Sequence, residues 1–185
     1  MPNACISPSM RLFVIALLLF VCGITRADEP RPITIHMIGD STMANKPLVP
    51  PNSERGWGQL LSLYFDEGVR IQNYAANGRS TRSFIAEGRW KTVLQNLKPG
   101  DYVIIQFGHN DEKTNNAGLG TAPFGAFKEN FESYVRETRE HQATPILATP
   151  IARRRFDSDG KFFDTHGDYP AAIRKVAEEQ KAPLL

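Results

Sequence analysis

Cysteine is nearly absent from this chain. Of its 185 residues only Cys5 and Cys22 are cysteines, and both lie within residues 1–27. If that first segment is removed, the remainder has no thiol, which excludes a disulfide scaffold, a thiolate zinc site and a cysteine nucleophile.

Net charge is also lacking. The chain has 22 basic and 20 acidic side chains, and residues 1–27 contain Arg11 and Arg26 but no acid, so the remainder is neutral. A neutral body provides no electrostatic basis for binding nucleic acid or a membrane surface, and we expect neither as a partner.

The chain lacks an apolar run of the ~20 residues that a helix needs to cross a bilayer. A shorter apolar run, residues 12–24, follows Arg11. The next three residues are Thr25-Arg26-Ala27, so small residues occupy the third and first positions before a cleavage site after Ala27. This pattern is typical of a secretory signal. We therefore predict that residues 1–27 are a signal peptide, that 28–185 form the mature domain, and that the protein is secreted or periplasmic. An uncleaved anchor is the weaker interpretation.

Common enzyme signatures are missing as well. The sequence has no Gly-x-Ser-x-Gly, no Gly-x-x-x-x-Gly-Lys, and no Gly-x-Gly-x-x-Gly after its first predicted strand. Their absence argues against an α/β-hydrolase, a phosphate-loop protein and a dinucleotide-binding protein. Asp40, Asn110 and Asp111 could form a metal site only with further ligands, so we predict no metal and no cofactor.

Short apolar runs alternate with amphipathic stretches in the rest of the chain, which is typical of a parallel sheet with helices on its faces. The predicted strands are 33–38, 69–75, 101–107 and 144–149, with the start of a fifth at 182–185. The predicted helices are 57–65, 90–97, 127–141 and one that begins near 169, and the segments 112–125 and 152–167 are predicted loops. We therefore predict one α/β domain that is C-terminally incomplete, because the chain stops as the fifth strand begins.

Three residues that can supply a hydroxyl, an open backbone N–H and a carboxamide follow the first three predicted strands: Ser41, Gly78 and Asn110. The carboxyl ends of parallel strands share one edge, so these residues should converge there. A serine hydroxyl at this edge can act as a nucleophile, and the N–H groups of Ser41 and Gly78 with the carboxamide of Asn110 can hold an oxyanion. Each piece alone has a simpler interpretation as a turn or a helix cap, but the ordered set favours acyl transfer.

Several segments then carry a family resemblance. They are Ile-Gly-Asp-Ser-Thr at 38–42, Gly-Trp-Gly at 56–58, Asn-Tyr-Ala-Ala-Asn-Gly-Arg-Ser-Thr-Arg-Ser-Phe at 73–84, Gln-Phe-Gly-His-Asn-Asp at 106–111, Thr-Pro-Ile-Ala-Arg-Arg-Arg-Phe at 149–156 and Thr-His-Gly-Asp-Tyr-Pro at 165–170. With them, residues 33–185 resemble the SGNH (GDSL-like) hydrolases, and within these the rhamnogalacturonan acetylesterases of carbohydrate esterase family 12.

The resemblance implies a flavodoxin-like, three-layer α/β/α sandwich without a cofactor. By similarity Ser41 corresponds to the nucleophile, and Gly78 and Asn110 correspond to oxyanion-hole residues. The implied activity is removal of O-acetyl groups from pectin-type polysaccharide or its oligosaccharides, and we expect a monomer.

The family's Asp-x-x-His element, which supplies the general base, is absent from residues 1–185. Because serine is a poor nucleophile without a base, we expect this chain to be nearly inactive. The alternatives are a gene fragment of an esterase and a non-catalytic carbohydrate-binding relative.

The chain's own histidines offer weaker candidates for that base. We expect His36 to be packed in its strand, His141 to end a helix, and His109 to have a structural or substrate-positioning role. His166 follows an acid on a loop after the fourth strand, so substrate binding, plain loop structure and, least favoured, a role as base stay open for it.

Arginines gather on the predicted loops. Arg79 and Arg82 follow the second strand, and Arg153 to Arg155 follow the fourth. One interpretation is a solvated or salt-bridged surface, which contributes little to stability. The other is that Arg79, Arg82 and Arg153 to Arg155 bind uronic-acid carboxylates, because a guanidinium pairs with a carboxylate bidentately.

Overall fold

Four short apolar segments form a parallel sheet in the computed structural model, which describes residues 31–185. The strands are β1 (Ile33–Gly39), β2 (Val69–Asn73), β3 (Tyr102–Gln106) and β4 (Thr144–Leu147), in the order β2-β1-β3-β4. Gly39 pairs with Gln106, so β1 and β3 end side by side. The predicted signal peptide lies outside the described residues.

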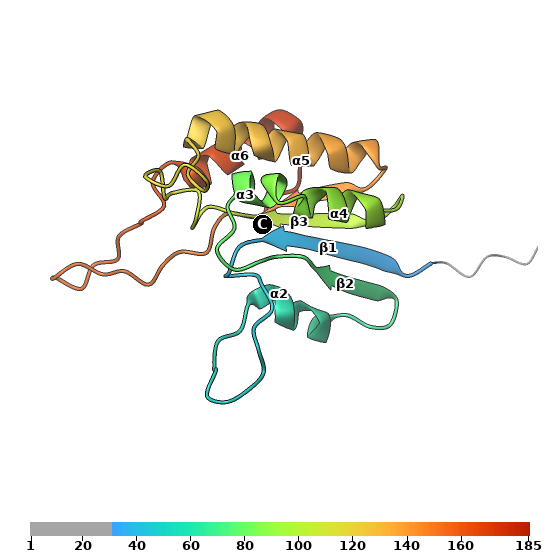
Figure 1. The fold of residues 1–185 in the computed structure, drawn as a ribbon, viewed down its shortest axis with the longest axis horizontal. Coiled ribbons are helices and arrows are strands. Elements are labelled where there is room, and N and C mark those ends of the chain that lie inside the picture. The colour runs from blue at the N-terminus through green and yellow to red at the C-terminus, as the bar shows by residue number, and fades with distance from the viewer. Residues whose placement is uncertain (1–30) are drawn as a thin grey trace, which may run out of the picture. The chain divides into compact units, whose positions relative to one another are not determined.

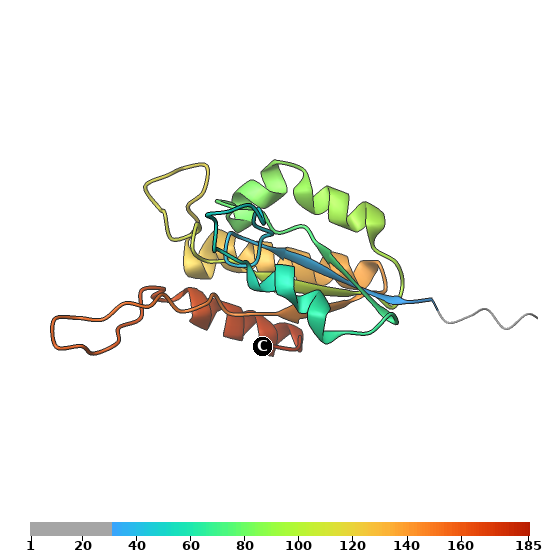
Figure 2. The same cartoon turned by 90° about the horizontal axis from the view of Figure 1, so that it is seen from below.

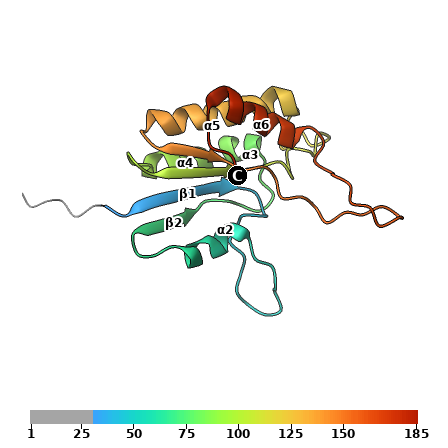
Figure 3. The same ribbon diagram turned by 180° about the vertical axis from the view of Figure 1, so that it is seen from behind.

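Helices cover both faces of the sheet, as Figures 1 and 3 show. One face carries α2 (Trp57–Leu60) with the 3₁₀ turn η1 (Leu61–Tyr64). The other carries α3 (Thr81–Ala86), α4 (Arg89–Asn96), α5 (Lys128–Glu140) and α6 (Tyr169–Gln180). The predicted three-layer α/β/α architecture is therefore confirmed.

Alternation along the strands divides the core in two. Ile38 faces a large cluster that includes Phe84, Phe131 and Tyr134 from the helices, whereas its neighbour Met37 faces a small cluster on the opposite side. All of these side chains are fully buried. Since each such burial contributes roughly 1.5–3 kcal/mol, the helix-rich face provides most of the apolar stabilisation.

The apolar pattern did not predict helix α3. Helix α3 has Ser80 as its N-cap, and the Ser80 and Ser83 side chains each accept a hydrogen bond from the other residue's backbone N–H. This reciprocal cap satisfies two of the N–H groups that a helix start leaves unpaired. Its signal in the sequence was a pair of serines three residues apart.

Other boundaries differ in detail. The predicted helix 57–65 is split into α2 and η1, and the predicted loop 112–125 ends in a π-helical turn, η2 (Pro123–Phe127), that leads into α5. The predicted fifth strand is represented by one parallel bridge between Leu147 and Leu184.

Residues 152–165, between β4 and α6, extend well away from the sheet, as Figures 1 and 2 show. We call this segment the excursion. An antiparallel bridge between Phe156 and Phe162 closes it, and their rings meet edge to face with centroids 6.1 Å apart. Both rings are about half exposed.

Candidate active site

The loops that follow β1, β2 and β3 contact one another at the carboxyl edge of the sheet. Ala76 N–H donates to the carbonyl of Gly39 at 3.0 Å, which joins the second loop to the first. The Asn110 Nδ2 group donates to the carbonyl of Arg79 at 3.0 Å, which joins the third to the second. The predicted convergence of these loops is therefore present in the fold.

Ser41 lies in a tight turn directly after β1. Met43 and Ala44 donate their N–H groups to the Asp40 carbonyl, and Thr42 donates both its N–H and its hydroxyl to Asp40 Oδ1 at 2.9 Å. The Ser41 side chain is partly exposed. Among residues 31–185, neither its hydroxyl nor its N–H makes a hydrogen bond, so both are free to meet a ligand.

The two other predicted oxyanion donors, Gly78 and Asn110, each have an N–H group without an acceptor in the described chain. Gly78 has φ +77°, a left-handed conformation that favours glycine, and its N–H donates to no acceptor in the described chain. Lys113 Nζ donates to Asn110 Oδ1 at 2.8 Å, so the Nδ2 group of this buried amide must face Arg79, next to Gly78. An amide nitrogen carries two protons, and one of them remains available.

Asp40, beside Ser41, is a fully buried carboxylate. Its Oδ2 lies 3.5 Å from His109 Nδ1. Burial acts to raise the pKa of Asp40, but the imidazole of His109 and the hydrogen bonds from Thr42 outweigh it and lower the pKa below its usual value. The turn that carries Ser41 is thus tied to the loop that carries Asn110.

Asp111 is a second buried carboxylate, one residue after Asn110. It accepts hydrogen bonds from the Thr81 and Thr121 hydroxyls at 2.6 and 2.8 Å and from the Thr81 N–H. Burial is the largest influence and raises the pKa of Asp111 to about 7, although these hydrogen bonds act to lower it. Asp111 also anchors the first residue of α3.

Gln106 is a residue at this edge that the sequence reasoning missed. Its Oε1 accepts from Trp57 Nε1 at 2.8 Å and lies 3.1 Å from the Thr42 hydroxyl oxygen, while its Nε2 donates to the Thr149 carbonyl at 2.9 Å. One buried amide therefore joins the loops after β1 and β4 to α2. The only signal was its position at the end of a strand.

His166 is buried, and both of its ring nitrogens are engaged. Nε2 lies 2.9 Å from the carbonyl of Ile151 and Nδ1 contacts Glu112. Neither ring nitrogen hydrogen-bonds to Ser41. The roles predicted for His166, in substrate binding, as loop structure or as base, stay predictions.

The other predicted histidines are placed as follows. His36 is buried in β1, 3.2 Å from Asp101, as expected of a packed strand residue. His141 follows α5, where Nδ1 donates to the Glu137 carbonyl. His109 is slightly exposed, with its ring edge against His166 at a centroid distance of 4.6 Å.

The predicted carboxylate-binding arginines differ in availability. Arg79 pairs with Glu87 at 3.0 Å, and Arg82 donates to the Ala117 carbonyl at 2.9 Å. Arg153 pairs with Glu112 at 2.6 Å. The side chains of Arg154 and Arg155 are exposed on the excursion, and neither has a hydrogen-bond or ion-pair partner within residues 31–185. Arg154 and Arg155 are therefore the most accessible of the five.

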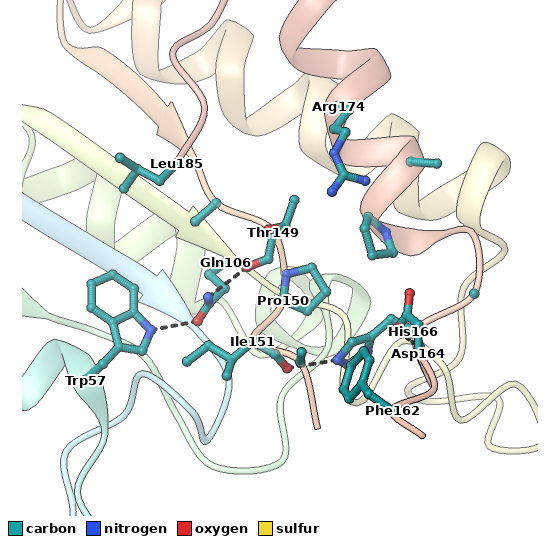
Figure 4. A pocket seen from close by; sticks show the side chains of 15 residues that line it. Trp57, Gln106, Thr149, Pro150, Ile151, Phe162, Asp164, His166, Arg174 and Leu185 are labelled. Atoms are coloured by element: carbon teal, nitrogen blue, oxygen red, sulfur yellow. Dashed lines mark hydrogen bonds between the residues drawn. The ribbon is translucent and has the colours of Figure 1, made fainter. Parts of the chain in front are cut away.

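A cavity of about 660 Å³ lies beside this edge, beyond the ends of β3 and β4. Figure 4 shows Trp57 and Gln106 on one side of it, with Arg174 and His166 on the other. Ser41, Gly78 and Asn110 do not line it. The cavity is thus adjacent to the predicted catalytic residues but separate from them.

Residues 31–185 contain no cluster of three or more histidine, cysteine or acidic side chains placed to hold a metal ion. Over the same residues, no helix is both long and apolar enough to cross a membrane.

Comparison with known sequences and structures gives consistent matches. A sequence model of the GDSL-like lipase/acylhydrolase family matches residues 37–185. Rhamnogalacturonan acetylesterase RhgT from Bacillus subtilis is 38% identical over 157 residues, which cover 84% of this chain and 65% of RhgT. The probable rhamnogalacturonan acetylesterase YesY from the same organism is 33% identical, over 82% of this chain and 68% of YesY.

Solved structures match the fold. The crystal structure of YxiM from Bacillus subtilis superposes with a TM-score of 0.74 at 33% identity, over 85% of this chain and 44% of that one. An acetylxylan esterase from Geobacillus stearothermophilus superposes with a TM-score of 0.59 at 22% identity, over 84% of this chain and 76% of that one. This chain therefore spans less than two thirds of RhgT and of YxiM.

Proposed function

This chain belongs to the GDSL-like lipase/acylhydrolase family, and on that basis we propose that it is a serine esterase that removes O-acetyl groups from polysaccharide. The observation that carries the proposal is the unengaged Ser41 hydroxyl in a turn whose loop adjoins those of Gly78 and Asn110. The acetylesterases among its relatives support this choice of acyl group.

In the proposed reaction, Ser41 Oγ attacks the acetyl carbonyl carbon and its proton passes to a base. The negative charge that develops on the carbonyl oxygen is held by the Ser41 and Gly78 N–H groups and the free N–H of Asn110. The sugar hydroxyl leaves with a proton, and an acetyl group remains on Ser41. Water then attacks this ester, which releases acetate and restores the serine.

No histidine within residues 31–185 hydrogen-bonds to Ser41. A triad without its base retains only the catalysis of binding and the oxyanion hole, roughly 10³- to 10⁴-fold over water. We therefore infer that residues 1–185 by themselves turn over slowly.

The proposed substrate is an acetylated, pectin-type polysaccharide. RhgT and YesY are named for rhamnogalacturonan, and the exposed, unpaired guanidinium of Arg155 suits a uronic-acid carboxylate. On the basis of the predicted signal peptide, the protein is proposed to be secreted or periplasmic. Its proposed oligomeric state is a monomer.

Covalent trapping tests this function even if turnover is slow. After long incubation with excess p-nitrophenyl acetate, mass spectrometry should find an acetyl group on Ser41, because this activated ester has a leaving group that needs no proton, whereas hydrolysis of the acetyl-serine without a base is slower still. The Ser41→Ala chain should acquire none, whereas the exposed-serine control Ser53→Ala should behave like the parent. Acetylation elsewhere, or none, would favour a non-catalytic carbohydrate-binding protein. Equal acetate release from acetylated rhamnogalacturonan and acetylated xylan would contradict the pectin preference.

A further inference from the structure

Glu112 connects the loop after β3 to both ends of the excursion. It follows β3, and its Oε2 accepts from Arg153 Nη1 at 2.6 Å, while its Oε1 contacts His166 Nδ1. Arg153 begins the excursion and His166 follows it, so these contacts bring together residues 41 and 54 positions apart from Glu112. Only about 16% of the Glu112 side chain is exposed, and His166 is almost completely buried.

Glu112, Arg153 and His166 form a cluster in which Glu112 and His166 are each held by two partners. His166 Nε2 donates to the carbonyl of Ile151, because a carbonyl oxygen only accepts. Each carboxylate oxygen of Glu112 has its own partner, one in Arg153 and the other in His166. Polar groups that are buried in this way persist when each is paired.

The cluster also contacts the loop of the proposed oxyanion hole. Arg153 Nη2 donates to the carbonyl of His109 at 3.4 Å, and the edge of the His109 ring packs against His166. His109 in turn faces Asp40 at 3.5 Å and directly precedes Asn110. If Arg153 and His166 moved, His109 would lose these two contacts and could move away from Asp40 and the Ser41 turn.

We propose that Glu112 is a positioning residue of this site: by pairing with Arg153 and His166 it holds His109 against Asp40 and sets the place of Asn110. The inference rests on the proposed function, because positioning Asn110 matters only if Asn110 binds an oxyanion. The NMR experiment that tests it does not require the chain to be an active esterase. Glu112 itself touches no reacting atom in the proposed reaction.

The test is Glu112→Gln in the full 185-residue chain, followed by ¹⁵N NMR of the histidine rings and of the Asn110 side-chain amide. The neutral amide removes the carboxylate that holds Arg153 and His166 together. In the variant, the signals of the His166 ring, the His109 ring and the Asn110 amide should therefore all shift from their positions in the parent.

The matched control is Glu179→Gln, which removes a carboxylate that pairs with Lys128 and Lys175 on the helical surface. It should leave the His109, Asn110 and His166 signals unchanged. If Glu112→Gln lowers thermal stability but moves neither His109 nor Asn110, Glu112 is only structural and the proposal is overturned.

A second variant covers the case in which Glu112→Gln does not fold. Arg153→Lys keeps the charge on Glu112 but loses the Nη2 contact to the His109 carbonyl. It should shift the His109 and Asn110 signals more than those of His166, which keeps its contact with Glu112, and unchanged His109 and Asn110 signals would overturn the proposal. Because these readouts need no turnover, they stay informative if the acetyl-trapping experiment fails.

Discussion

The turns after β1 and β3 each bury a carboxylate completely, yet the two acids titrate in opposite directions. Asp40 faces the imidazole of His109, which can be cationic, and its pKa lies below its usual value. Asp111 is met by the neutral hydroxyls of Thr81 and Thr121, and burial raises its pKa to about 7. Equal burial therefore does not decide the charge of a side chain; the chemical nature of its partners does.

The difference in pKa between Asp40 and Asp111 is consistent with what each carboxyl group contacts. Beside Ser41, the negative charge of Asp40 faces His109 at 3.5 Å and accepts the hydrogen bonds of Thr42 that close the turn. At the start of α3, a carboxyl that is about half protonated at pH 7 can hold a helix end without placing a full second charge next to Asp40. The three predictions below test this contrast, beginning with the largest effect.

Asp111→Asn should change the pH dependence of stability most. A carboxyl whose folded pKa lies near 7, against a usual 3.8, binds its proton more tightly in the folded state. Its contribution to stability is full below about pH 4 and is lost as the pH rises through 7, a difference of about 4 kcal/mol. Urea unfolding from pH 4 to 8 should show this decline in the parent and not in the variant.

The control for that experiment is Asp159→Asn, at an exposed position on the excursion. It should keep the parent's slope between pH 4 and 7. If the parent and Asp111→Asn differed by a constant amount across this range, Asp111 would be ionised throughout and the contrast with Asp40 would disappear.

Asp40→Asn should act in the opposite sense. Because the folded pKa of Asp40 is lowered, its stabilisation is present above its usual pKa and is lost as the pH falls through the folded value. Removing the charge should reduce the free energy of unfolding at pH 7 by about 2 kcal/mol, the typical loss for a hydrogen bond to a charged group. The same denaturation series should show the two proteins converging in acid, and a deficit that persists there would point to a packing defect.

Thr121→Val should have the smallest effect, about 1 kcal/mol, because it removes one hydroxyl donor to Asp111 without changing the shape of the side chain. It should also raise the pKa of Asp111 further, which moves the midpoint of the stability decline to higher pH. Thr138→Val is the matched control, since the buried Thr138 hydroxyl has no partner among the described residues. A loss as large in the control would mean that the hydroxyl of Thr121 contributes only by filling space.

The sequence predicted the sheet well, for a physical reason. Strands buried on both faces are continuous apolar runs, and β1, β3 and β4 lie within the predicted ranges or extend them by one residue. The start of α6 at Tyr169-Pro170 was equally clear, because proline fits the first turn of a helix. Local composition was sufficient in both cases.

Helix α3 could not be predicted in that way. It is only six residues long and depends on Asp111, 30 positions further along, to accept the Thr81 N–H. The Glu112 cluster has the same character, since it pairs residues from loops that only the folded sheet brings together. The loop positions of Ser41, Gly78 and Asn110 were predictable because parallel topology sends every strand end to one edge.

The excursion has a consequence for how this protein can vary. Both of its ends are fixed, one through Arg153 and the other through His166, and both attach to Glu112. Its tip is a solvent-exposed turn in which Gly160 N–H donates to the Asp157 carbonyl. Insertions and deletions at such a tip cost little, because closing a longer loop adds only a fraction of a kcal/mol. The excursion can therefore become longer or shorter during evolution. Its fixed ends keep the sheet edge that carries Ser41, Gly78 and Asn110 in place.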